Sequence, residues 1–268
     1  MKDLKALCAE IEIAARQAGE FIMKESATFD VRNTEIKGLN NFVSYVDKGS
    51  EKMLIEKLAS LIPEAGFVAE EGTSVKKGKK FNWIIDPLDG TTNFLHGVHP
   101  FAVSIGLMED DEVIAGVVHE PGWNETFTAW KGGGAWLNGK RINVSPVQHL
   151  SGSLVATGFP YNLFDRLDPY MDLLKHLVRN THGIRRMGSA AIDIAYVACG
   201  RYDLFYEYDL KIWDIAAGML IVREAGGRFS DFSGKMTGLD GSETLASNAF
   251  IYDEILEIIQ LYMGNKTN

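Results

Sequence analysis

Apolar residues recur at helical spacing in two stretches near the N-terminus. The first stretch contains Leu4, Leu7, Ile11, Ala14, Ala18 and Phe21, and the second contains Met53, Leu54, Leu58, Leu61 and Ile62. This spacing predicts two helices, the second of which ends before Pro63. Residues 33–50 between them, NTEIKGLNNFVSYVDKGS, are polar and rich in asparagine and glycine. They predict a loop or mobile hairpin over the surface.

Short apolar runs that end in acids and glycine follow the second predicted helix. Residues 66–72 (GFVAEEG) and 83–90 (WIIDPLDG) are two such runs, and both predict strands. Residues 101–144 contain further strand-like segments separated by turn residues such as Asn138-Gly139. This pattern predicts an antiparallel meander with a tight hairpin turn at Asn138-Gly139.

Strand-like and helix-like segments alternate in the second half of the chain. Predicted strands cover residues 153–159, 183–187, 202–207, 226–234 and 244–248, and predicted helices cover 168–180, 189–199, 213–225 and 250–262. Such alternation predicts a layered α/β fold. Because no proline- or serine-rich linker separates the halves, we expect a single domain over residues 1–268 with only a soft division near residue 150.

The composition is that of a globular protein with a large core. The chain has 268 residues, 46% hydrophobic and 24% charged, and a formal net charge of −9. No apolar run reaches the roughly 18 to 20 residues that span a bilayer, and no signal-peptide layout is seen, so we expect a soluble cytoplasmic protein without a membrane partner. The acidic balance argues against a nucleic-acid partner. Cys8 and Cys199 are expected to be reduced core residues.

The stretch WIIDPLDGTTNF, residues 83–94, ends an apolar run in oxygen-bearing groups. Asp86 and Asp89 lie three positions apart, and a tight turn between them would hold both carboxylates and the Leu88 carbonyl near one point. Ligands that offer only oxygen suit a hard cation such as Mg²⁺. Residues 91–97 can begin a helix, whose first backbone N–H groups would bind a phosphate. A metal ion and a phosphate could therefore share this turn.

These acids also have a simpler interpretation. Two carboxylates three residues apart in a loop are often only turn formers and helix caps. Two other acid-bearing ends favour a functional site, because Glu70 terminates an apolar run and Asp214 opens an apolar helix. We therefore expect these acids to converge.

Other catalytic motifs are weak in this sequence. Residues 134–140, GAWLNGK, resemble a phosphate-binding loop, but Arg141 stands where a serine or threonine must reach the metal. A hairpin is the better interpretation. His96 and His99 are interpreted as hydrogen-bonded structural residues.

Long stretches of the sequence resemble the signatures of the inositol monophosphatase family, a group of lithium-sensitive, Mg²⁺-dependent phosphatases. They are WIIDPLDGTTNFLHG, the preceding VAEEG, GIRRMGSAAIDIAYVACGRYDLFYE and LKIWDIAAGMLIVREAGG. The resemblance covers nearly the whole chain and implies an αβαβα sandwich, assembled as a homodimer. It also implies that the half of the chain before residue 150 carries the metal and phosphate ligands and that the rest is the α/β half.

The resemblance further implies a set of site residues and two or three Mg²⁺ ions per subunit. The first ion would be held by Glu70, Asp86, the Leu88 carbonyl and Thr91, and the second by Asp86, Asp89 and Asp214. Glu70 and Thr91 would orient the attacking water, with Asp47 accepting a hydrogen bond from Thr91. The implied substrate-binding residues are Asp89, Gly90, Thr91, Ala190, Glu207 and Lys37, the last on the polar loop.

The implied activity is hydrolysis of a small polyol phosphate monoester, with myo-inositol monophosphate as the leading substrate. Two ions about 4 Å apart would activate the water and stabilise the leaving oxygen. Fructose-1,6-bisphosphatase and histidinol-phosphatase activities are alternatives, and Lys211 could favour a second phosphate. A third alternative, 3′-phosphoadenosine 5′-phosphate phosphatase, is disfavoured because WDIAAGML, residues 213–220, differs from the nucleotide-phosphatase signature. A non-catalytic regulatory protein on this fold would be expected to have lost one of the acids or Thr91, and all are present.

Overall fold

The computed structural model describes residues 3–30, 34–38, 41–72, 77–161, 163–238 and 240–264, and for residues 34–38 and 41–43 it describes the backbone alone. These residues form seven α-helices and three sheets. The helices are α1 (Leu4–Ser26), α2 (Tyr45–Leu61), α3 (Thr91–Leu95), α4 (Leu167–Asn180), α5 (Ala190–Ala198), α6 (Ile212–Glu224) and α7 (Tyr252–Met263). A short 3₁₀ helix, η2, covers Leu150–Gly152.

The largest sheet has seven strands in sequence order, which confirms the predicted meander. They are β3 (Gly66–Ala69), β4 (Phe81–Asp89), β5 (Ala102–Glu109), β6 (Glu112–Glu120), β7 (Glu125–Trp130), β8 (Ala135–Leu137) and β9 (Lys140–Ile142). Strands β3 and β4 are parallel, and the remaining pairs are antiparallel. Asn138 (φ 48°) and Gly139 (φ 73°) turn the chain between β8 and β9, as a two-residue hairpin requires.

The second sheet has five strands in the order β11-β10-β12-β14-β13. They are β10 (Leu154–Thr157), β11 (Gly183–Arg185), β12 (Leu204–Tyr208), β13 (Arg228–Ser230) and β14 (Glu243–Ser247). Strand β10 is parallel to β11 and β12, and β14 is antiparallel to β12 and β13. Every strand and helix predicted in this half of the chain is present.

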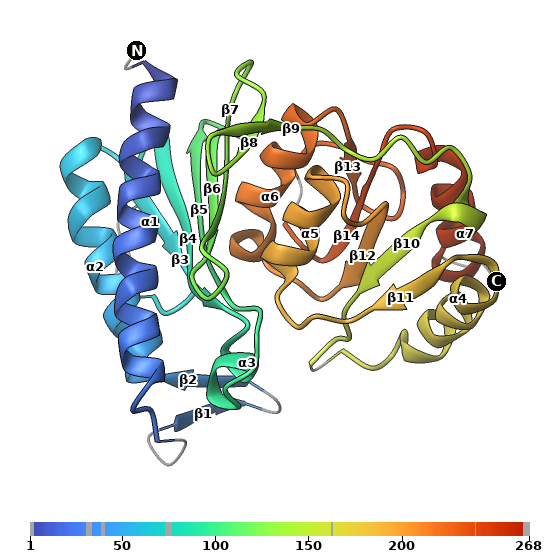
Figure 1. Ribbon diagram of the computed structural model, residues 1–268, viewed down its shortest axis with the longest axis horizontal. Helices are drawn as coiled ribbons and strands as arrows, with labels where there is room; N and C mark the ends of the chain where they lie inside the picture. The colour runs from blue at the N-terminus through green and yellow to red at the C-terminus, as the bar shows by residue number, and fades with distance from the viewer. Residues whose placement is uncertain are drawn as a thin grey trace.

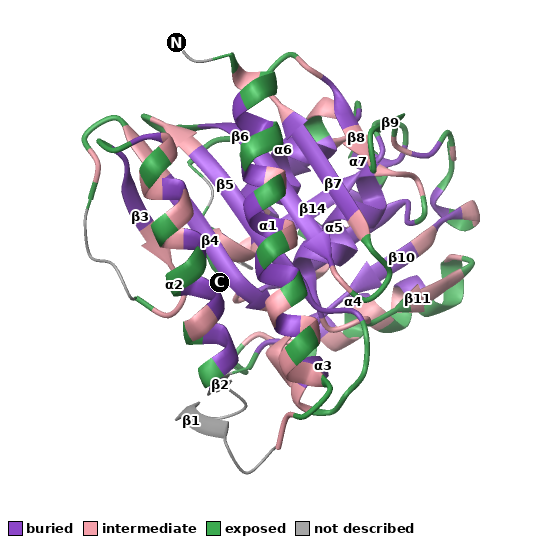
Figure 2. Ribbon diagram, turned by 60° about the vertical axis from the view of Figure 1, so that its left-hand side comes forward, coloured by how far each residue is buried: buried purple, intermediate pink, exposed green. Residues whose placement is uncertain are grey.

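Helices and sheets alternate as five layers, which confirms the αβαβα sandwich (Figure 1). Helices α1 and α2 cover the outer face of the seven-stranded sheet, α5 and α6 lie between the two sheets, and α4 and α7 cover the outer face of the five-stranded sheet. Three clusters of buried apolar side chains fill the interfaces between these layers. Figure 2 shows α1 with one buried and one exposed side, as its predicted amphipathic pattern requires.

The polar stretch between the first two helices is only partly a loop. Strands β1 (Thr34–Gly38) and β2 (Asn41–Ser44) form an antiparallel pair, and α2 already begins at Tyr45. The prediction that residues 45–50 belong to a loop is therefore wrong. The helix begins early because Ser44 caps it: Ser44 Oγ accepts from the Val46 N–H, and Asp47 accepts from the Ser44 N–H.

The helices in the described part of the chain are too short or too polar to cross a bilayer. Cys8 and Cys199 are both free thiols, as predicted, Cys8 fully and Cys199 partly buried.

Candidate active site

A bulge in strand β4 brings two of the predicted acids together. The prediction of a tight turn at the end of this strand is wrong, because β4 continues to Asp89, which pairs with Ala102 of β5. Asp86 pairs with Ser104, so three steps along β4 match only two along β5. Residues at odd spacing in a regular strand point to opposite faces, and the one extra residue places both acids on the same side.

Asp214 joins these two acids from the first turn of α6. Its carboxylate accepts a hydrogen bond of 2.7 Å from the backbone N–H of Lys211, which fixes the start of the helix. Asp86, Asp89 and Asp214 each contribute an oxygen atom to a group whose members all lie within 4.8 Å of one another. The expected convergence of acids from β4 and α6 is therefore present in the fold.

These carboxyl groups are hard to ionise together. Burial raises the pKa of Asp86 well above its ordinary value, and the charges of Glu70, Asp89 and Asp214 raise it further. Burial, followed by the charge of Asp89, raises the pKa of Asp214 to about 7. Burial also raises the pKa of Asp89.

The donor set fits a divalent cation. Carboxylate oxygens gathered at this spacing are the ligands that Mg²⁺ uses, and positive charge between them would relieve their mutual repulsion. Glu70, the residue after β3, lines the same pocket but lies outside the group of three. The Leu88 carbonyl, which was expected to face a metal, accepts from the Thr91 hydroxyl at 3.0 Å.

Thr91 begins helix α3 and links the pocket to α2. Its Oγ1 atom lies 3.0 Å from Asp47 Oδ1 and 3.0 Å from the Leu88 carbonyl oxygen, so either oxygen can accept its one proton. Asp47 is fully buried and its second oxygen accepts from the N–H and the hydroxyl of Ser44. Burial raises the pKa of Asp47, while these hydrogen bonds oppose the increase. The Thr91 proton is thus directed toward Asp47 or the Leu88 carbonyl.

The backbone at Gly90 needs glycine. Its φ of 91° is left-handed, and a Cβ atom there would lie 3.1 Å from the carbonyl oxygens of Gly188 and Pro100. This conformation turns the chain sharply from β4 into α3, which leaves Gly90 and Thr91 in the pocket wall.

The N-terminus of α5 holds Asp89 in place. The Ser189 hydroxyl donates to Asp89 Oδ2 at 2.5 Å, and the backbone N–H of Ala191 donates to the same oxygen at 2.7 Å. A hydrogen bond from the backbone N–H of Ala190 also favours the ionised form of Asp89, and so it opposes part of the increase in pKa that burial causes. Ala190, one of the predicted substrate-binding residues, therefore lies beside Asp89.

One pocket contains most of the predicted residues. It is lined by Glu70, Asp86, Leu88, Asp89, Gly90, Thr91, Ala190, Glu207 and Asp214. Glu207 comes from β12 in the second sheet, and burial raises its pKa well above the ordinary value. The side chain of Lys37 is outside the described part of the chain, so its predicted role stays a prediction.

Sequence reasoning missed several residues of the pocket wall. They are Thr157, Tyr161, Arg186, Ser189 and Asp193. Ser189 and Asp193 carry recognisable signals: a serine stands at the start of the predicted helix 189–199, and an aspartate interrupts its apolar run. Arg186 and Tyr161 lie in segments whose sequence does not indicate that they fold against the acids.

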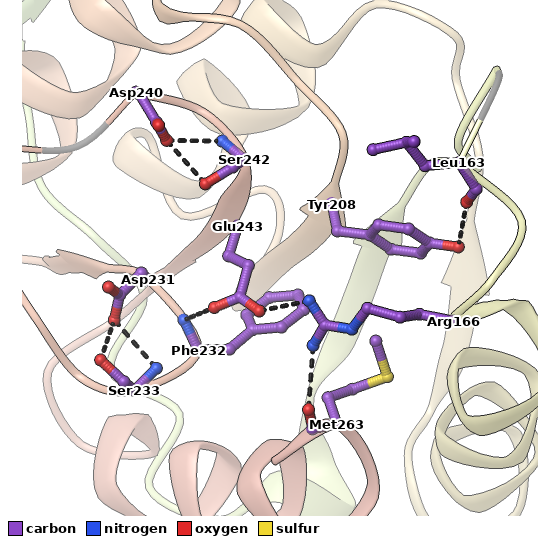
Figure 3. A network of polar contacts seen from close by, with 10 residues as sticks. All are labelled: Leu163, Arg166, Tyr208, Asp231, Phe232, Ser233, Asp240, Ser242, Glu243 and Met263. Carbon is purple, nitrogen blue, oxygen red and sulfur yellow. Dashed lines mark hydrogen bonds and ion pairs between the residues drawn. The ribbon is translucent and has the colours of Figure 1, made fainter. Parts of the chain in front are cut away.

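The segment that carries Tyr161 is anchored on both sides. The Tyr170 hydroxyl donates to the Gly158 carbonyl at 3.0 Å. On the other side the Tyr208 hydroxyl donates to the Leu163 carbonyl at 2.9 Å, and Arg166 pairs with Glu243 and bonds the Met263 carbonyl (Figure 3). These bonds tie the segment beside the pocket to α4, β12, β14 and the end of α7.

The fold and the pocket together define a layered α/β protein with an acidic pocket suited to metal ions. The chain belongs to the inositol monophosphatase family, because the sequence profile of that family matches residues 3–263.

The relatives of this chain carry two different names. It is 43% identical over 255 residues to the Nus factor SuhB of Pseudomonas aeruginosa, covering 93% of this chain and 94% of that protein. It is 40% identical over 254 residues to the inositol-1-monophosphatase of Rhizobium meliloti, covering 94% and 96%. The crystal structure of the extragenic suppressor protein suhB from Bartonella henselae superimposes with a TM-score of 0.89 at 37% identity, covering 98% of this chain and all of that one.

Proposed function

We propose that this protein hydrolyses phosphate monoesters of small polyols in a Mg²⁺-dependent reaction, with myo-inositol monophosphate as its preferred substrate. The observation that carries the proposal is the convergence of Asp86, Asp89 and Asp214 within 4.8 Å, in one pocket with Thr91. The family, and the inositol-1-monophosphatase name of the Rhizobium meliloti relative, support this choice. The three aspartates, with Glu70 and the Leu88 carbonyl, would hold the cations.

Bound Mg²⁺ would supply activation of water and neutralisation of charge on the phosphate and the leaving oxygen. The chain itself orients the reactants. Thr91 Oγ1, whose proton is directed toward Asp47 or the Leu88 carbonyl, can accept a hydrogen bond from the attacking water. Glu70, which lines the same pocket and whose charge acts on Asp86, would also hold that water. Backbone N–H groups of Gly90 and Thr91 would donate to phosphate oxygens.

Glu207 would select the alcohol part of the substrate. Its carboxyl group packs against Gly158, where a Cβ atom would lie only 2.1 Å from Oε2, so its position is tightly defined. A buried carboxyl group that can hydrogen-bond a substrate hydroxyl is left unpaired by an analogue that lacks the hydroxyl. Glu207 would therefore favour polyol phosphates over phosphates of simple alcohols.

Fructose 1,6-bisphosphate is the second candidate substrate. Lys211, whose charge could favour a second phosphate, forms an ion pair with Asp209 at 3.1 Å, which reduces its attraction for another anion. Arg186 lines the pocket itself, and its positive charge is the reason why a bisphosphate stays a candidate substrate.

A substrate comparison tests the proposed function. Phosphate release is measured from myo-inositol 1-phosphate and from fructose 1,6-bisphosphate, each without Mg²⁺ and over a Mg²⁺ titration. We expect Mg²⁺-dependent release with a higher kcat/KM for the inositol ester. A higher kcat/KM for the bisphosphate would reassign the protein as a sugar bisphosphatase, and no Mg²⁺-dependent release from either would contradict the proposal.

Other relatives are named Nus factor SuhB, and this name suggests an alternative function that does not require catalysis. The feature that favours catalysis in this chain is that the three aspartates, Glu70 and Thr91 are all retained in one pocket. Such retention is not needed for a surface that only binds a partner.

We include in the proposal the homodimer that the family resemblance implies, which sedimentation analysis would test.

A further inference from the structure

Helix α5 is apolar along its length except at Asp193. Its sequence is AAIDIAYVA, and each of its nine residues is buried. Asp193 itself exposes 2% of its surface. A carboxyl group inside an apolar helix is costly unless it is fully hydrogen-bonded.

Only one side of this carboxyl group is hydrogen-bonded. The backbone N–H of Met187 donates to it, whereas Oδ1 has less than 1 Å² of exposed surface and no hydrogen-bond partner. Within the described part of the chain, the other buried side-chain atoms without a partner belong to Trp83, Tyr206 and Thr244. Asp193 is the member of this set that lines the acidic pocket.

The charge of Asp193 acts on Glu207. Among the charges that raise the pKa of Glu207, Asp193 has the largest effect, ahead of Asp214 and Asp89. Arg186 lowers the pKa of both acids. The two carboxyl groups line the same pocket and lie close enough for the charge of Asp193 to act on Glu207. A polyol offers hydroxyl groups that both donate and accept.

We propose that Asp193 is a second hydroxyl-recognising residue, and that Asp193 and Glu207 together bind two hydroxyl groups of the polyol. The proposal rests on the proposed function for the position of the polyol in the pocket. A substrate hydroxyl at this carboxyl group, which lines the pocket, would supply the buried acid with a further hydrogen-bond partner. A substrate without that hydroxyl would leave the acid unpaired and bind more weakly.

The test compares substrates in the Asp193→Asn variant, which keeps the shape of the side chain. With saturating Mg²⁺, kcat/KM is measured for myo-inositol 1-phosphate and for p-nitrophenyl phosphate, which has no hydroxyl groups. We expect the variant to lose at least about tenfold more on the inositol ester than on the aryl ester, mainly through KM. Asp172→Asn, at an exposed aspartate of α4 paired with Lys175, is the matched control and should change neither value.

Equal losses on the two esters would overturn the proposal, because they would mean that Asp193 only positions Arg186 or helix α5. No loss on either ester would overturn it too. If Asp193→Asn does not fold, the wild-type protein is assayed with a series of monodeoxy inositol 1-phosphates. At least two deoxy positions should then lower kcat/KM, and a single costly position would contradict a second recognising residue.

Failure of the proposed function is separable from failure of this inference. If the wild-type protein releases no phosphate from any ester, binding of myo-inositol 1-phosphate is measured by calorimetry in the presence of Mg²⁺. Binding that is at least about tenfold weaker in Asp193→Asn would support the role of Asp193. Equal affinities, or no binding by the wild-type protein, would overturn it.

Discussion

The Thr91 hydroxyl oxygen lies 3.0 Å from Oδ1 of Asp47, although the two residues are 44 positions apart in the sequence. Asp47 also caps helix α2 through the Ser44 N–H, so its carboxylate cannot rotate freely. The hydrogen bond therefore fixes Thr91 between a helix terminus and the pocket. A side chain held in this way can orient a water molecule.

We predict that Thr91→Ala lowers kcat by at least about 100-fold, because it removes the group that orients the attacking water. KM should change much less, since the hydroxyl is not proposed to hold the substrate. Steady-state kinetics with myo-inositol 1-phosphate measures both values. Thr181→Ala is the control, because among the described residues that hydroxyl bonds the Leu177 carbonyl of the preceding helix, α4. An effect of Thr91→Ala confined to KM would refute the water-orienting role.

Asp89→Asn and Asp214→Asn should each abolish Mg²⁺-dependent phosphate release. Both acids belong to the group of three whose oxygens lie within 4.8 Å, and an amide cannot replace a charged ligand. Their metal-free melting temperatures should not fall below that of the wild-type protein, since each change removes a repelling charge. Near-normal turnover in either variant would mean that the cluster does not hold the catalytic metal.

The stability of the metal-free protein should decrease as the pH rises from about 4 to about 7. The pKa of Asp214 is raised from 3.8 to about 7 in the folded state, so folding favours its protonated form. This contribution is complete below the unfolded pKa and is lost as the pH passes through the folded value.

The measurement is the difference in melting temperature between the wild-type protein and Asp214→Asn, both with chelator, across this pH range. The difference isolates the cluster from other titrating groups. As the pH rises, the melting temperature of the wild-type protein should fall relative to that of Asp214→Asn. Saturating Mg²⁺ should cancel this relative fall. A difference that is constant with pH would show that the cluster ionises freely.

Gly158→Ala should lower kcat/KM for myo-inositol 1-phosphate more than for p-nitrophenyl phosphate. A Cβ atom at Gly158 would lie 2.1 Å from Glu207 Oε2, so the carboxyl group must move from its place in the pocket. Gly152→Ala is the control, because a Cβ atom there meets only Val147, at an ordinary 3.6 Å. Equal effects of Gly158→Ala on the two esters would argue against Glu207 as a polyol ligand.

The helices and strands were largely predictable because their apolar periodicity is regular. Residues 168–180 and 213–225 were predicted as helices, and α4 and α6 match them within one residue at each end. The stretch at residues 45–50 was not, because its polar character masks a capped helix start at Ser44. The polar composition of this stretch favours a loop, but the capping hydrogen bonds at Ser44 stabilise a helix there.

The site was predictable only in part. Asp86, Asp89 and Asp214 were found as acids at the ends of apolar runs, but the bulge that aligns the first two depends on pairing with β5. Arg186, the residue after β11, lines the pocket although no local sequence signal indicates it. The layer order itself came from the family resemblance.

The chain passes from the seven-stranded sheet to the five-stranded sheet once, between β9 and β10. Asp86, Asp89 and Thr91 precede this crossing, whereas Asp214 and Glu207 follow it. A nascent chain that stops before residue 214 therefore cannot complete the acid cluster, however well its first sheet has folded. The same division makes phosphate release a readout of fragment complementation for a protein cut at the crossing, since each fragment alone holds an incomplete site.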